Sequence, residues 1–113
     1  MSFKTFALVI VNALLLVAGQ VFWKKAVVQD GVGLGQLIAN WMVWIGFAFF
    51  GLATLVWFYV LAAAPLSKAL PLQSITYFLG LLAGILFFKE TVSGASLLGT
   101  LCILVGVFLV SSS

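Results

Sequence analysis

The charged residues of this chain, five lysines and two acids, lie at the ends of long uncharged segments, and this spacing restricts the possible folds. The uncharged segments cover positions 5–23, 31–67, 69–88 and 91–113, which are 19, 37, 20 and 23 residues long. A helix needs about 20 apolar residues to cross the hydrocarbon core of a bilayer. The segments therefore predict four membrane-spanning helices, with the longest segment holding one helix and a glycine-rich loop.

Composition supports the same fold class. Of the 113 residues, 65% are hydrophobic and only 6% are charged, whereas a soluble domain has about 25% charged residues. We therefore expect an all-α membrane protein, a four-transmembrane-helix bundle that assembles as a dimer in the inner or plasma membrane. The expected helices span about 6–23, 37–63, 65–88 and 93–110 of a single four-helix transmembrane domain, residues 1–113.

Several function classes are excluded by the residues that the chain lacks. It has no histidine, one cysteine (Cys102, inside the last segment), and two carboxylates, Asp30 and Glu90, both near expected helix ends. We find no nucleophile with a base and no metal-ligand cluster, so we expect neither an enzyme nor a cofactor or metal site. The net charge of +3 is small and dispersed, which argues against nucleic acid as a partner.

Two polar residues interrupt the first helix. Asn12 and Gln20 are eight residues apart and so lie on roughly the same side of a helix. Either they hydrogen-bond to neighbouring helices and hold the bundle together, or they line a polar cavity. Both interpretations are open for Asn12, and the small Gly19 beside Gln20 favours a cavity there.

The third helix begins with an unusual combination of two prolines and a lysine, Pro65, Lys68 and Pro71. Pro71 cannot donate a hydrogen bond to the carbonyl of Ser67, so we expect a kink. A lysine beside a broken helix inside a membrane is a candidate functional residue. Its long side chain could equally reach the lipid head groups.

One face of this third helix changes character along its length. Gln73, Tyr77, Gly80 and Gly84 share that face, which passes from polar residues to a Gly-x-x-x-Gly pair suited to close helix contact. This layout predicts a cavity that is closed at one end. Its expected lining is Asn12, Gln20, Lys68, Gln73 and Tyr77.

The remaining segments suggest connections and packing. Residues 28–36, with three glycines, are expected to form a loop, and residues 88–93 a tight turn with Lys89 and Glu90 at the membrane surface. The fourth helix carries a stripe of small residues that suits packing within the chain or between subunits: Ala95, Gly99, Cys102 and Gly106.

Three motifs follow one another in the second half of the chain: PLSKALPL at 65–72, FFKETVS at 87–93 and LLGTLCILVGVFLV at 97–110. In this order and spacing they resemble the drug/metabolite transporter superfamily, in its four-helix, small-multidrug-resistance-like and EamA-like branch. LLVAGQVFWKKA at 15–26 and GLATLVWFYVLAAAPLSKALPL at 51–72 are most similar to the small subunits of the aminoarabinose-lipid flippase. The resemblance spans essentially the whole chain.

The resemblance implies a membrane transporter or flippase subunit that contacts membrane lipids and pairs with an identical or similar subunit. In the small multidrug exporters, a glutamate on the first helix binds the cationic drug. The matching position here is the apolar Leu16, and Ala69 and Leu72 replace pocket aromatics. We therefore expect an anionic or lipid-linked amphipathic substrate, with Lys68 attracting a phosphate and Lys24 at the cavity rim. The alternatives are a small-molecule exporter and a non-transporting structural subunit.

Overall fold

The structure, a computed structural model, describes residues 2–113 and contains only helices in this range. Four segments are long and apolar enough to cross a membrane. They are α1, α3, the α4–α5 pair and α6, so the predicted all-α, four-span fold class is confirmed. The helices are α1 (Phe3–Asp30), α2 (Leu34–Ala39), α3 (Trp41–Ala63), α4 (Leu66–Gln73), α5 (Ile75–Phe88) and α6 (Gly94–Ser112).

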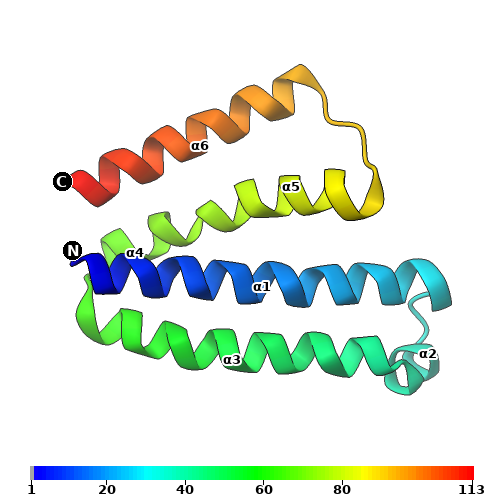
Figure 1. Cartoon of the computed structure of the whole chain (residues 1–113). Helices are drawn as coiled ribbons and strands as arrows, with labels where there is room; N and C mark the ends of the chain where they lie inside the picture. The colour runs from blue at the N-terminus through cyan, green and yellow to red at the C-terminus, as the bar shows by residue number, and fades with distance from the viewer. Residues whose placement is uncertain (1) are drawn as a thin grey trace.

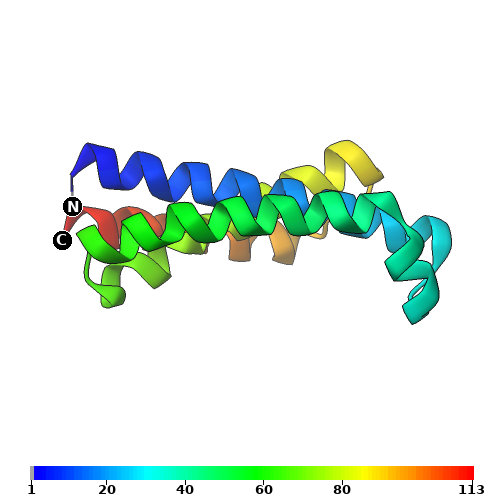
Figure 2. The ribbon, with the colours of Figure 1, turned by 90° about the horizontal axis from the view of Figure 1, so that it is seen from below.

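The spans alternate in direction, so both chain termini lie at the same end of the molecule (Figure 1). α1 lies between α3 and the α4–α5 pair, and α6 packs against the α4–α5 pair. Seen along the other direction, the bundle is thin (Figure 2), with extents of 46 × 35 × 18 Å. A thin bundle of this kind leaves most side chains on its surface, as expected where lipid replaces water around the protein.

Glycines allow α1 and α3 to approach closely. A Cβ on Gly19 would lie 3.0 Å from the carbonyl oxygen of Gly46, and a Cβ on Gly46 would lie 2.2 Å from Nε1 of Trp23. The Trp23 ring fills the space above Gly46, donates a hydrogen bond of 3.0 Å to the Val43 carbonyl, and stacks on Phe50 at 4.4 Å between ring centroids. Trp23 is therefore a packing residue of this helix pair.

A cluster of buried apolar side chains connects all four spans near the end where the termini lie. Its members come from α1, α3, α4 and α6: Val9, Val60, Ala69, Leu72 and Val107. Ala69 and Leu72 thus belong to the core and not to a pocket wall. Because these contacts hold the spans together at this end, α5 and α6 can diverge towards the other end (Figure 1).

The first connection differs from the predicted loop over residues 28–36. α1 continues to Asp30 and ends at Gly31, whose φ of 85° lies in the left-handed region that glycine adopts readily. The short α2 follows, and Asn40 then separates α2 from α3. The Asn40 side chain accepts a hydrogen bond from the Met42 N–H (2.9 Å) and donates one to Asp30 (2.7 Å), so it caps α3 and ties it to the end of α1.

The predicted kink after Pro71 is confirmed, and it divides the third span into α4 and α5 at Ser74. The Ser74 N–H bonds the carbonyl of Pro71 (3.1 Å), and the Tyr77 N–H bonds that of Ser74 (2.9 Å). Both bonds join residues three apart, which tightens the chain at the break. As a result, α5 leaves α4 in a changed direction.

The Gly46 contact generates a stability prediction. Gly46→Leu is expected to lower the free energy of unfolding by about 1–3 kcal/mol, because the new side chain must displace Trp23 from a packed position. Gly51→Leu is the matched control, since nothing lies within 4 Å of a Cβ placed at Gly51. Unfolding would be followed by tryptophan fluorescence in micelles of rising denaturing-detergent content. Equal losses in the two variants would contradict the tight α1–α3 contact.

Candidate functional site

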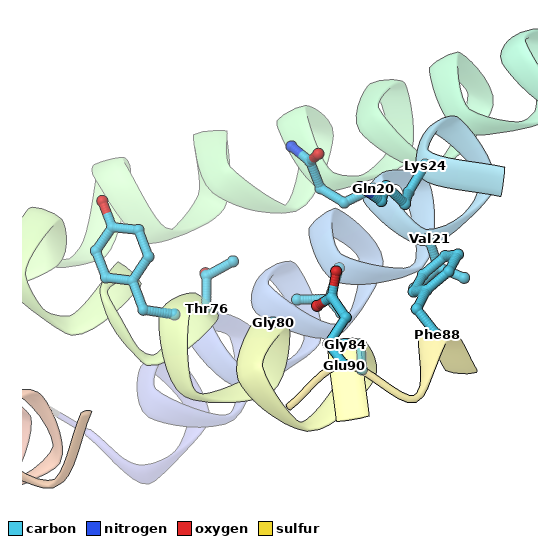
Figure 3. A pocket seen from close by; sticks show the side chains of 11 residues that line it. Gln20, Val21, Lys24, Thr76, Gly80, Gly84, Phe88 and Glu90 are labelled. Carbon is cyan, nitrogen blue, oxygen red and sulfur yellow. The ribbon is translucent and has the colours of Figure 1, made fainter. Parts of the chain in front are cut away.

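A groove of about 440 Å³ lies between α1 and α5. Gln20, Val21 and Lys24 face it from α1, and Thr76 and the two glycines of α5 face it from the opposite wall (Figure 3). We call this the α1–α5 groove. Its full lining is Val17, Gln20, Val21, Lys24, Thr76, Tyr77, Gly80, Ala83, Gly84, Phe88 and Glu90.

A second hollow, of about 380 Å³, continues the groove towards α4. It shares Gln20, Thr76 and Tyr77 with the first and adds Gln73 at its α4 end. Three of the five predicted site residues, Gln20, Gln73 and Tyr77, therefore come together along one channel between α1 and the α4–α5 pair.

Asn12 lies behind this channel and not on its surface. Its side chain is 1% exposed, and its amide donates a hydrogen bond of 2.8 Å to the Ala53 carbonyl. Its amide oxygen accepts a hydrogen bond of 3.2 Å from the Gln73 side chain. Of the two interpretations open for Asn12, the geometry supports the packing one, in which Asn12 ties α1 to α3 and orients Gln73.

Of the two interpretations open for Lys68, the geometry supports the one in which its side chain reaches the end of the bundle and does not line the cavity. It lies near the end of the bundle that carries the termini, and its ammonium donates a hydrogen bond to the carbonyl of Ser113. The reason is the position of Lys68 one turn after Pro65, at the start of α4, from which its long side chain reaches outward.

Gly80 and Gly84 also differ from the prediction, because no other helix within residues 2–113 packs closely against them. Among these residues nothing lies within 4 Å of a Cβ placed on Gly80, and the atoms nearest one on Gly84 belong to the Glu90 side chain. Both glycines instead leave space in the α1–α5 groove, while the close helix contact is formed by Gly19 and Gly46.

Two charged residues also line the groove: Lys24, which the sequence placed at the cavity rim, and Glu90, which it placed at the membrane surface. Lys24 is four residues after Gln20 and so lies on the same helix face. This spacing alone indicates that the two side chains line the same groove. Glu90 depends on the turn after α5: Lys89 adopts a left-handed conformation with φ of 52°, and the N–H groups of Lys89 and Glu90 both bond the Gly84 carbonyl. This turn directs the carboxylate back over α5 (Figure 3).

The groove carries polar and charged groups that can bind a ligand. Within residues 2–113, no three His, Cys, Asp or Glu side chains lie close enough to hold a metal ion. The groove offers amide, hydroxyl, ammonium and carboxylate groups beside apolar walls. Such a surface suits an amphipathic ligand with a polar head.

The four apolar spans and this polar-lined groove are those of a small integral membrane protein that can bind an amphipathic ligand. The chain is 33% identical to a probable 4-amino-4-deoxy-L-arabinose-phosphoundecaprenol flippase subunit ArnE of Aeromonas salmonicida, over 90% of this chain and 92% of that protein. It is 36% identical to the ArnE protein of Pseudomonas savastanoi pv. phaseolicola, over 92% and 94%. It also matches an ArnF subunit of Serratia proteamaculans, with 42% identity over 56% of this chain and 50% of that protein.

The chain therefore belongs to the family of aminoarabinose-phosphoundecaprenol flippase subunits, as its motifs indicated. It is a multi-pass inner-membrane protein. No model of a protein family matches the sequence, and no solved structure matches it.

The Asn12 contacts generate a second stability prediction. Asn12→Leu is expected to cost about 1 kcal/mol of unfolding free energy, because interhelical hydrogen bonds within membranes contribute roughly this much. Thr54→Val is the matched control, since the Thr54 hydroxyl bonds Phe50 within the same helix. Both variants would be compared in the detergent unfolding assay. If they lose the same stability, Asn12 has no special role between the helices.

Proposed function

We propose that this chain is one subunit of a flippase that moves an amino-sugar-linked polyprenyl phosphate across the inner membrane, and that it acts as a transporter and not as an enzyme. The observation that carries the proposal is the α1–α5 groove, with polar and cationic groups beside apolar walls, in a chain that aligns over nearly its whole length with ArnE proteins. In this view residues 1–113 form a single transporter domain.

The groove suggests how each part of such a lipid would be held. Lys24, near the end of the first uncharged segment, would bind the phosphate through a charge-assisted hydrogen bond. Gln20 and Tyr77, at the junction of the two hollows, would hydrogen-bond sugar hydroxyl groups. Val17, Val21 and Phe88 would contact the first part of the polyprenyl chain.

The predicted site residues therefore fall into two groups, those that would bind the lipid and those that would support the site. Gln73, held by Asn12, would act at the α4 end of the channel. Lys68, bonded to Ser113 at the end of the bundle, would anchor α4 and would not contact the phosphate. Of the two lysines that the sequence linked to an anion, Lys24 and not Lys68 would then bind the phosphate.

We further propose that the working unit contains two subunits. The relatives include both ArnE and ArnF chains, each named as a flippase subunit. Residues 2–113 form a bundle only 18 Å thick with its groove open at the side. A second, similar subunit covering that groove would enclose the head group during transfer, so we favour a heterodimer with an ArnF-like chain.

Transport by the reconstituted protein tests the function. Liposomes that contain the chain together with an ArnF-type subunit are expected to move aminoarabinose-phosphoundecaprenol between leaflets, as measured by accessibility of the amine to an impermeant reagent. Lys24→Gln should slow this transfer about tenfold, the loss expected for one charge-assisted hydrogen bond. Lys25→Gln and Lys68→Ala should leave it unchanged.

The two controls separate the role of Lys24 from general charge effects. Lys25 adjoins Lys24, but its ammonium lies over the Phe87 ring, 5.7 Å from the centroid. Lack of transfer by the wild-type pair would leave a structural subunit as the function of this chain. Transfer of simple quaternary cations instead of the lipid would indicate a small-molecule exporter.

A further inference from the structure

The turn after α5 places a carboxylate in the groove, whereas the lining predicted from the sequence contained no acid. The Gly84 carbonyl accepts the Glu90 N–H at 3.1 Å. The absence of a side chain at Gly84 then leaves room for the Glu90 carboxylate, because a Cβ there would lie 2.3 Å from Oε1. The carboxylate therefore lies against the α5 wall of the groove (Figure 3).

Lys24 faces the same groove from the opposite wall, α1 (Figure 3). Three other charged side chains have partners of their own: Lys25 lies over Phe87, Asp30 accepts from Asn40, and Lys68 donates to Ser113. In the part of the chain that the structure describes, Lys24 and Glu90 have no such side-chain contact. One positive and one negative group are thus both available to a ligand between α1 and α5.

We propose that Lys24 and Glu90 together recognise a zwitterionic head group, with the phosphate at Lys24 and an ammonium at Glu90. This inference rests on the proposed function and adds the feature by which the lipid is selected. A sugar that carries a phosphate at one side of its ring and an amine at the other presents its charges in opposite directions. The groove presents complementary charges on opposite walls.

The arrangement selects the amine as well as the phosphate. A polyprenyl phosphate without an amine would leave Glu90 facing the groove near an anion, which is unfavourable at the low dielectric of a membrane boundary. An amino sugar removes this penalty and gains a charge-assisted hydrogen bond. Glu90 would therefore distinguish the amino-sugar lipid from other polyprenyl phosphates.

Binding of two matched lipids to the two-subunit complex in phosphatidylglycerol nanodiscs tests this proposal. One lipid is aminoarabinose-phosphoundecaprenol, and the other is its N-acetylated analogue, in which the amine carries no charge. Glu90→Gln is expected to weaken binding of the amine about tenfold and to leave the analogue unchanged or slightly tighter. Lys24→Gln should weaken both lipids, and Asp30→Asn, the matched control, neither.

Each outcome bears on a different claim. If Glu90→Gln weakens both lipids equally or neither, the assignment of the ammonium to Glu90 is overturned while the proposed function stands. If the wild-type complex binds neither lipid, the proposed function fails and this inference fails with it. Phosphatidylethanolamine also carries an ammonium and a phosphate, and its displacement of the amino-sugar lipid at equal concentration would overturn the assignment to an amino sugar.

Discussion

The position of the third span depends on the Asn12 side chain. Lipid offers no hydrogen-bond partners, so a buried amide must find them within the protein. Asn12 donates to the Ala53 carbonyl and accepts from Gln73, which joins α3, α1 and the end of α4 through one residue. Because α5 follows directly after Gln73, this contact also sets where the far wall of the α1–α5 groove begins.

Most of the fold could be predicted from the sequence. Uncharged runs predicted the four spans, and Pro71 predicted the break between α4 and α5, because both signals act through local chemistry. The prediction of a loop over residues 28–36 was wrong in part. Gly31 alone ends α1, and the neighbouring glycines lie within or beside α2. The close helix contact predicted for Gly80 and Gly84 was also wrong, because spacing alone could not tell whether that face of α5 meets another helix.

The site was less predictable, because it depends on which faces meet. Gln20, Gln73 and Tyr77 line one channel. The position of Lys68 at the bundle end follows from the direction of α4, which the sequence did not specify. The role of Glu90 depends on a left-handed Lys89. A lysine in that conformation leaves no clear pattern in a single sequence.

The groove is open at its side, which limits the part of a bound lipid that the protein can recognise. A hollow of about 440 Å³ has room for a head group, and under the proposed function most of a long polyprenyl chain would remain outside it, among the acyl chains of the bilayer. The groove would then select its lipid by the head group and not by the length of the tail. Lipids with shorter or longer isoprenoid tails would be equivalent cargo, provided that they share one head.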